Sequence, residues 1–297
     1  MTFINKFKRV IAYTPGQDQL IKTIEKIRGL YKPNKMIGRN LTFSPDNSST
    51  DLLVFAAHAD DDILGLGITL SRHSIKERIK IIFTTNGTAD WTGTRQSWNI
   101  SKRKAKKRAE NRYKEAAKAL ALIGIPEENI FCLGYPDSGT HRYLSSMFKD
   151  IQMILQKFNP EKVYVHSIEG GHNDHDMTSY VVKTCCQLNG FDDVHEWAQY
   201  NPWRPQRIGT TDVQFLPSPF HEDFKGVQLN IADEERLLKK KMLAKHVSQN
   251  VIPYFMQGEA TRKANLLHAY EELFEFCRLP KPRLRRIIKN FQRSLPC

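Results

Sequence analysis

Two short segments of the sequence concentrate histidine and carboxylate side chains. In the first, A57-H-A-D-D-D62, His58 is followed by Asp60, Asp61 and Asp62, directly after the apolar run LLVFA. Carboxylates at the end of a buried strand repel one another unless their pKa values shift or a cation lies between them. The alternative is a helix N-terminus, where these aspartates cap the first turn and complement the helix dipole.

The second segment, G171-H-N-D-H-D176, holds His172, Asp174 and His175 and follows the apolar run KVYVH. A histidine, carboxylate and histidine set suits Zn2+, and three protein ligands leave one coordination position open for water, as a catalytic site requires. A carboxylate that is not a ligand is a natural general base for that water. A lone surface histidine in GGHNDHD is the alternative interpretation.

The two segments can act together only if the fold brings them to one place. Between residues 51 and 180, short apolar runs alternate with helical patterns, which indicates parallel βαβ units in an α/β fold. We predict a Rossmann-like three-layer α/β/α sandwich with a mainly parallel sheet, in which both segments lie at the carboxyl edge of the strands. The predicted strands are Leu52–Ala57, Ile79–Thr84, Asn129–Gly134 and Lys162–His166, and the predicted helices lie near Ile63–Arg78, Ser101–Ile123, Tyr143–Phe158 and Asp176–Leu188.

Beyond residue 190 the pattern loosens into a less regular C-terminal extension. We expect strands at Val213–Leu216 and Gly226–Ile231, and a helix over Asp233–Gln249 with Asp233 as its cap. The tail RLRRIIKNFQRSL has the spacing of a short basic amphipathic helix. Docking on its own domain is favoured for this tail over contact with an anionic membrane surface.

The two polar segments resemble the motifs A-H-P-D-D-E and H-P-D-H of the PIG-L/LmbE-like de-N-acetylases. In that family the first histidine, the second aspartate of the D-D pair and the last histidine bind zinc. The resemblance places these roles on His58, Asp61 and His175, and the role of general base on Asp60. It implies a deacetylase domain at residues 51–276, between an N-terminal helical or irregular segment, 1–50, and the basic amphipathic tail, 277–297.

The resemblance assigns roles to the other members of the second segment as well. His172 stabilises the transition state or protonates the leaving amine, and Asp174 orients and tunes that histidine. Three residues depart from the family pattern, because Ala59 and Asn173 replace prolines and Asp62 replaces a glutamate. Asp62 is one methylene shorter, so a contact that the family's glutamate makes behind the ligands is expected to be missing or water-bridged.

Three further stretches resemble the family away from these motifs. R112-Y-K-E115 is similar to an R-x-x-E helix in which the arginine binds substrate, although Arg112 also fits a solvated helix face. Asp137, in Y135-P-D-S-G139, matches an aspartate that contacts sugar hydroxyls, although a type I turn explains this stretch too. The segment KMLAKHVSQ is similar to a late helix, which places His246 either near the site or in the interior.

Composition limits the partners and the compartment. Lysine and arginine exceed aspartate and glutamate by 45 to 32, which favours anionic partners. Much of the excess lies in Lys102–Arg112 and after Cys277 without interleaved aromatics, so no nucleic acid is expected. The N-terminus shows no signal peptide, and five cysteines without CxxC spacing give no disulfide framework. We expect a cytoplasmic protein, peripheral at the inner membrane surface if the tail binds lipid.

The resemblance therefore implies a zinc-dependent N-deacetylase with one Zn2+, or another divalent metal, per chain. It would remove the N-acetyl group from an N-acetylglucosamine-type sugar in a glycoconjugate and release acetate. The positive charge favours an acceptor that is phosphate-bearing or lipid-linked. The alternative is a catalytically inactive sugar-binding or regulatory protein on the same fold, against which the intact ligands and base argue.

Overall fold

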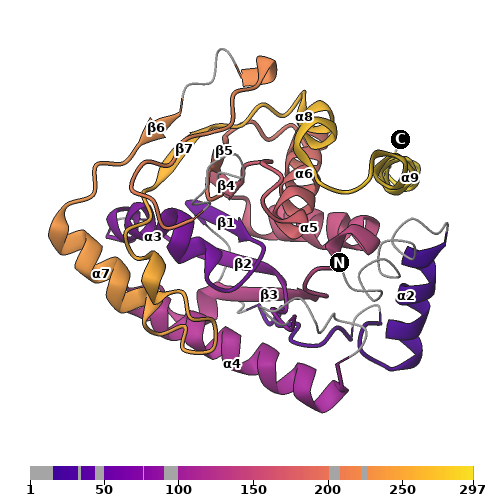
Figure 1. Cartoon of the computed structure of the whole chain (residues 1–297), viewed down its shortest axis with the longest axis horizontal. Coiled ribbons are helices and arrows are strands. Elements are labelled where there is room, and N and C mark those ends of the chain that lie inside the picture. Colours follow the sequence, from indigo (N-terminus) through magenta and orange to yellow (C-terminus); the bar gives the residue numbers. More distant parts are fainter. Residues whose placement is uncertain are drawn as a thin grey trace, which may run out of the picture.

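The computed structural model describes residues 16–32, 35–43, 50–75, 77–89, 100–200, 208–221 and 226–296. They form a seven-stranded sheet of order β3-β2-β1-β4-β5-β7-β6 (Figure 1). Strands β1 to β5 run parallel, and β7 and β6 are antiparallel additions beside β5. The strands are β1 Leu52–Ala56, β2 Ile79–Thr85, β3 Ile130–Tyr135, β4 Lys162–His166, β5 Val194–Trp197, β6 Val227–Gln228 and β7 Ala260–Lys263.

Helices cover both faces of this sheet, with α3, α4 and α7 on one side and α5, α6, α8 and α9 on the other (Figure 1). The α-helices are α2 Gln17–Ile27, α3 Asp61–His73, α4 Lys102–Ala121, α5 Leu144–Phe158, α6 Asn173–Leu188, α7 Asp233–Leu243, α8 Ala269–Phe276 and α9 Lys281–Gln292. Short 3-10 turns follow β3 and precede β6 and β7, at Thr140–Arg142, Pro219–His221 and Ile252–Tyr254.

The apolar strand runs are continuous because helices cover both faces of the sheet. Leu53 and Phe55 of β1 belong to the core under α5 and α6, whereas Leu52 and Val54 belong to the core under α3. Successive side chains of a strand point to opposite faces, so a strand buried on both sides is apolar throughout rather than alternating. The predicted α/β sandwich with a mainly parallel sheet is confirmed.

The C-terminal extension differs from the prediction in three respects. Val213–Leu216 forms no strand, because β6 at Val227–Gln228 takes the edge position beside β7. Helix α7 ends at Leu243, not at Gln249, and turns follow it. Asp233 is not its cap, since the carboxylate of Glu235 instead accepts the backbone N–H of Ala232, at 2.9 Å.

The basic tail forms α9 and docks on the domain. Its apolar side chains pack in the same core as α5 and α6, and the ring of Phe291 contacts Phe148 and Tyr180. The apolar face is therefore engaged within the protein and is not presented to a lipid surface. The buried residues of α9 are Leu284, Ile287, Ile288 and Phe291. Residues 1–15 and Cys297 of the predicted end segments lie outside the described residues.

No helix of the described segments is both long and apolar enough to cross a bilayer. The cysteines of the described segments, Cys132, Cys185, Cys186 and Cys277, are buried free thiols. No disulfide therefore contributes to the fold over these segments.

Candidate metal centre and active site

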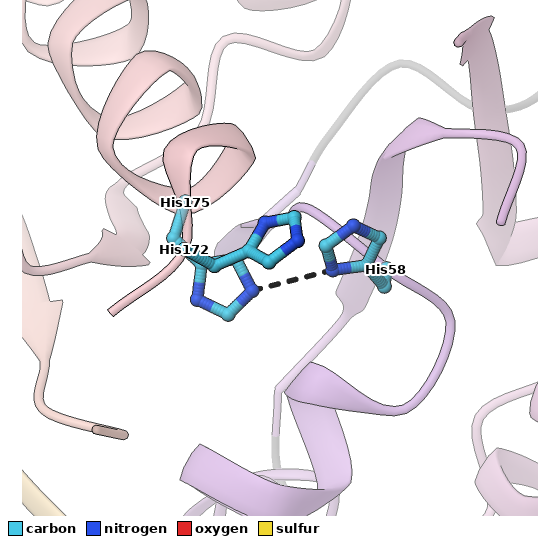
Figure 2. A group of neighbouring side chains, drawn as sticks. All are labelled: His58, His172 and His175. Carbon is cyan, nitrogen blue, oxygen red and sulfur yellow. Dashed lines mark hydrogen bonds between the residues drawn. The ribbon is translucent and has the colours of Figure 1, made fainter. Parts of the chain in front are cut away.

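The two polar segments meet at the point where the strand order of the sheet reverses. From β1 the chain proceeds outward through β2 to β3, whereas β4 lies on the other side of β1. Ligands of open α/β sheets bind in the crevice at such a reversal, outside the carboxyl ends of the strands. His58 follows β1 directly, and His172 and His175 open α6 after β4. Figure 2 shows the three imidazoles gathered between these two segments.

Three side-chain atoms form a compact triangle at this position. His58 Nδ1 lies 3.2 Å from His175 Nε2, and Asp61 Oδ2 lies 3.1 Å from each of these nitrogens. Tetrahedral zinc with ligands at about 2.0–2.1 Å requires ligand atoms that are about 3.3 Å apart. The three atoms need to move apart only slightly to reach this spacing. The donor set and its spacing therefore fit a divalent cation with three protein ligands.

Nearby histidines have their lone pairs committed elsewhere. Among the described residues, overlapping groups that include His166 or His172 also lie close enough to share an ion. However, His166 Nε2 accepts the backbone N–H of Ala57 at 2.9 Å, and His172 Nδ1 accepts that of Asp174 at 3.2 Å. The triangle therefore remains the better set of ligands.

Asp61 is held as an ionised carboxylate within this triangle. Its Oδ1 accepts a hydrogen bond from Gln199 Nε2 at 2.6 Å, and its Oδ2 accepts the backbone N–H of His58 at 2.8 Å. Burial alone would raise the pKa of Asp61, but His175 and His58 hold the pKa well below its usual range. An ionised, oriented carboxylate is what a metal ligand requires.

Asp60 occupies the N-cap position of α3, yet its side chain makes no capping hydrogen bond. It lines the same cavity as His58 and Asp61. Burial, together with the charge of Asp61, raises the pKa of Asp60 to about 7. The capping interpretation is therefore wrong for Asp60, whose carboxylate is available to accept a proton near neutral pH.

Two carboxylates face the other ring nitrogen of His58. Asp137 Oδ1 and Asp174 Oδ2 each lie 3.4 Å from His58 Nε2. Asp174 is fixed by Ser138 N–H at 2.5 Å and by the hydroxyl of Thr140 at 2.6 Å. A carboxylate behind an imidazole fixes its tautomer and orientation, so Nδ1 of His58 is left as the ligand atom.

Asp174 contacts His58 as well as His172, the histidine that it is predicted to orient and tune. Its carboxylate bonds to the loop at residues 138–140 and faces His58, and only its backbone N–H bonds to His172. The cause is the start of α6, where His172 is the N-cap and accepts the N–H of Asp174. Asp174 therefore orients His58 through its side chain and His172 through its backbone.

Asp62 is buried and both of its carboxyl oxygens lack a hydrogen-bond partner among the described residues. Burial, with the neighbouring Asp60 and Asp61, raises the pKa of Asp62 well above its usual range. Burial therefore favours the protonated form of this carboxyl.

Arg112 and Asp137 lie together at the rim of the cavity. Arg112 Nη1 is 3.5 Å from Asp137 Oδ2, and the arginine side chain is 16% exposed, so it does not lie on a solvated helix face. Gly87, at φ 59°, makes room for it, since a Cβ there would lie 2.6 Å from Arg112 Cδ. Asp137 Oδ2 also accepts the N–H of Ala89 at 3.1 Å.

The cavity over these residues has a volume of about 360 Å³, in the range of small-molecule sites. Its polar lining includes the acids, the histidines and Arg112. Its apolar and aromatic lining residues are Leu64, Tyr200, Ile208, Val251 and Tyr254.

His246 lies behind this cavity and does not line it. It is fully buried, and its Nδ1 is 3.2 Å from Nε2 of Gln249, which does line the cavity. The neighbouring Ser248 donates its hydroxyl hydrogen to Glu115 at 2.7 Å. The two stretches R112-Y-K-E115 and H246-V-S-Q249 are thus joined, and His246 is an interior residue that supports Gln249.

Three residues near the triangle were missed from the sequence. His166, at the end of β4, stacks on His175 with ring centroids 3.9 Å apart, and Gln199 bonds Asp61. The ring of Tyr200 lies 5.2 Å from that of His175. Only His166 had a signal, as a polar residue that ends an apolar run. Gln199 and Tyr200 follow β5, and the place of β5 beside β4 is not local information.

The comparisons with known proteins agree with this geometry. The PIG-L family model, described as GlcNAc-PI de-N-acetylase, matches residues 53–186. A search of curated proteins finds no match to this chain.

Among solved structures, the zinc inhibited form of teicoplanin deacetylase Orf2 is 18% identical and covers 72% of this chain and 97% of its own, with a TM-score of 0.54. N,N'-diacetylchitobiose deacetylase from Pyrococcus horikoshii is 19% identical and covers 86% of this chain and 95% of its own, with a TM-score of 0.51. At these identities the likeness concerns the fold. The family match spans both polar segments, so the predicted resemblance is confirmed: residues 53–186 of this chain match the PIG-L family model.

Proposed function

We propose that this protein is a metal-dependent hydrolase that removes the N-acetyl group from an N-acetylglucosamine-type sugar in a glycoconjugate and releases acetate. The observation that carries the proposal is the triangle of His58 Nδ1, Asp61 Oδ2 and His175 Nε2, with the unengaged carboxylate of Asp60 in the same cavity. The PIG-L match and the deacetylases of similar fold support the amide and the amino sugar as substrate.

Zn2+ is the cation that we propose for the triangle, because two imidazole nitrogens and one carboxylate oxygen suit its ligand preference. When bound, such a cation polarises an acyl carbonyl and acidifies a water molecule. Among the described residues, no lysine or arginine forms an ion pair with Asp61. The charge partners of Asp61 are the histidines.

Asp60 serves as general base in this proposal. Its carboxylate takes a proton from the water whose oxygen attacks the acyl carbonyl carbon. With a pKa raised by burial to about 7, it is a stronger base than an exposed aspartate while still ionised near neutral pH.

His172 is placed to act as a neutral hydrogen-bond donor, because burial lowers the pKa of its imidazole to about 4. The proton that Asp60 takes from the attacking water passes to the leaving nitrogen as the C–N bond breaks. Nδ1 of His172 accepts the backbone N–H of Asp174, so the neutral ring carries its proton on Nε2. The residue lines the cavity and its ring packs edge-on against His58, with centroids 4.7 Å apart. The same Nε2–H is a donor for the oxyanion that develops before the bond breaks.

Arg112 and Asp137 are proposed to position the sugar. Their guanidinium and carboxylate groups supply donors and acceptors for sugar hydroxyls in the cavity, which Tyr254 and Val251 also line. A cytoplasmic location remains part of the proposal.

A deacetylation screen tests the function. Free, nucleotide-linked and lipid-linked N-acetyl sugars are incubated with the protein, and acetate release is measured with chelator, without it, and after zinc is restored. We expect release from at least one amino sugar, its loss with chelator and its recovery with zinc. Binding of an N-acetyl sugar without acetate release under every condition would instead support an inactive sugar-binding protein.

A further inference from the structure

Cations gather where α2 meets α4. Residues 26–43 and 100–109 contain eleven lysines and arginines and no aspartate or glutamate, and Glu110, which follows, lies 3.7 Å from Lys106. The two stretches touch, because Arg28 Nη2 donates to the carbonyl of Ile100 at 3.3 Å and Lys102 Nζ lies against Gly29. We call the exposed part of this junction the α2–α4 surface. Its exposed cations are Lys26, Arg28, Lys32, Lys35, Lys102, Arg103, Lys104, Lys106 and Lys107.

The fold itself does not favour this arrangement. The first turn of α4 carries Lys102, Arg103 and Lys104 and no acid, although positive charge is unfavourable at a helix N-terminus. Lys102 and Lys106 are four residues apart, as are Arg103 and Lys107, so like charges are neighbours on the helix surface. An anionic partner outside the chain would relieve this repulsion.

Exposed apolar side chains lie on α2 as well, and one of them, Ile27, stands between Lys26 and Arg28 of this surface. Leu20 is 61% exposed and Ile27 is 79% exposed, and their spacing of seven residues puts both on one face of α2. Figure 1 shows α2 at the outer edge of the molecule, with its end beside the start of α4. A soluble polyanion needs only the cations, whereas a lipid surface engages both kinds of side chain.

We propose that the α2–α4 surface docks on an anionic membrane, with the cations against lipid headgroups and Leu20 and Ile27 inserted between them. This is a different contact from the tail, whose apolar face is buried in the domain.

The position of the surface connects docking with the cavity. Arg112, which lines the cavity, lies eight residues along α4 from Lys104, a distance of about 12 Å. A sugar linked to a lipid of the docked membrane is thus close enough to reach the cavity. This last step rests on the proposed function, whereas the docking itself does not.

Vesicle co-sedimentation of the full chain tests the docking. The probes are phosphatidylcholine vesicles with and without phosphatidylglycerol, with chelator present so that no metal contributes. We expect binding only to the anionic vesicles, and binding weaker by roughly tenfold or more for Lys106→Glu with Lys107→Glu. The matched control, Arg285→Glu with Lys289→Glu on exposed positions of α9, changes the charge equally and should bind as the wild type does. Equal losses in both variants, or a loss only in the control, would overturn the proposal.

A second variant separates a membrane from a soluble polyanion. Leu20→Ser with Ile27→Ser keeps every cation, and we expect its binding to anionic vesicles to fall about several-fold. If it binds vesicles as the wild type does, and polyphosphate competes fully, the surface is a polyanion site and the membrane proposal fails. Acetate release from a soluble amino sugar is measured in parallel, so loss of docking with intact hydrolysis is distinguished from failure of the proposed function.

Discussion

Two buried clusters of this protein combine histidines with carboxylates, and they differ in where their positive charge comes from. The site triangle, His58, Asp61 and His175, lies at the carboxyl ends of β1 and β4. A second cluster, which we call the charge network, lies among β5, β7, α6 and α8. It consists of Lys183, Glu196, His221, Arg262 and Glu272.

In the charge network the fold supplies its own cations. Lys183 pairs with Glu196 and lies 3.0 Å from Glu272, and Arg262 lies 2.6 Å from Glu196. Burial raises the pKa of Glu196 less than Lys183 and Arg262 lower it, so that its pKa falls to about 2. Charges that neutralise one another inside the protein leave no demand for an ion.

The triangle has two imidazoles where the network has an ammonium and a guanidinium. Burial alone would lower the pKa of His58, but Asp137 and Asp61 raise it well above its usual range, so without a cation the imidazoles serve as the positive partners of Asp61. An imidazole can give up its proton and offer a lone pair to a metal ion, which an ammonium or guanidinium at neutral pH does not do. Among the described residues, Asp61 has only histidine partners whereas Glu196 pairs with a lysine and an arginine, and the predictions below test that difference.

The largest expected effect concerns Asp60. Asp60→Asn keeps the three ligands but removes the proton acceptor, and we expect kcat to fall by about 10²–10⁴-fold with metal content unchanged. Asp62→Asn is the matched control, since Asp62 does not line the cavity and burial favours its protonated form, which asparagine imitates. Steady-state acetate release measures both, and comparable kcat values for the two variants would remove Asp60 from the mechanism.

Removal of Lys183 should lower the stability of the protein without affecting metal binding or activity. Lys183→Met leaves Glu196 and Glu272 without their shared cation, and we expect a loss of about 3–5 kcal/mol in the free energy of unfolding. Denaturant titration measures this loss, and metal content and kcat of the folded variant should stay unchanged.

The pH dependence of that loss has a defined sign. Burial raises the pKa of Glu272 to about 7, so it is protonated in the folded protein below that pH and charged above it. The variant should therefore lose more stability at about pH 8 than at about pH 6. A larger loss at the lower pH would show that Glu272 is not the group left uncompensated.

Much of this fold can be predicted from local sequence. Lys162–His166 is a strand with the predicted bounds, and Ser101 caps α4 as its predicted start implies, because both features depend on neighbouring residues. The meeting of His58 and His175 was also predictable, since parallel strands end at one edge of the sheet.

What could not be predicted depends on which strands become neighbours. Gln199 reaches Asp61 because β5 pairs with β4, and Glu115 reaches Ser248 because α7 packs on α4. Val213–Leu216 has the composition of a strand, but the edge of the sheet was taken by β6. The network likewise joins residues that are far apart in the chain, and nothing in its local sequence indicates that they meet.

The smallest expected effect concerns one arginine in each of the two regions. Arg112 lowers the pKa of Asp60, which burial and Asp61 otherwise raise. Arg112→Gln should therefore move the acidic limb of the kcat/KM pH profile to higher pH, because the base must be ionised to act. Arg262→Gln, in the network, should leave that limb in place, and a shift in both variants would show that the effect is not local to the site.

We expect the triangle to bind a metal ion and the charge network to bind none. Metal content per chain, measured on purified wild type and variants, tests this expectation most directly. We predict about one zinc ion per chain in the wild type. His58→Ala and His175→Ala should lose this ion, whereas His221→Ala and Glu272→Gln should keep it. Unchanged metal content in the first pair of variants, or its loss in the second pair alone, would contradict the account.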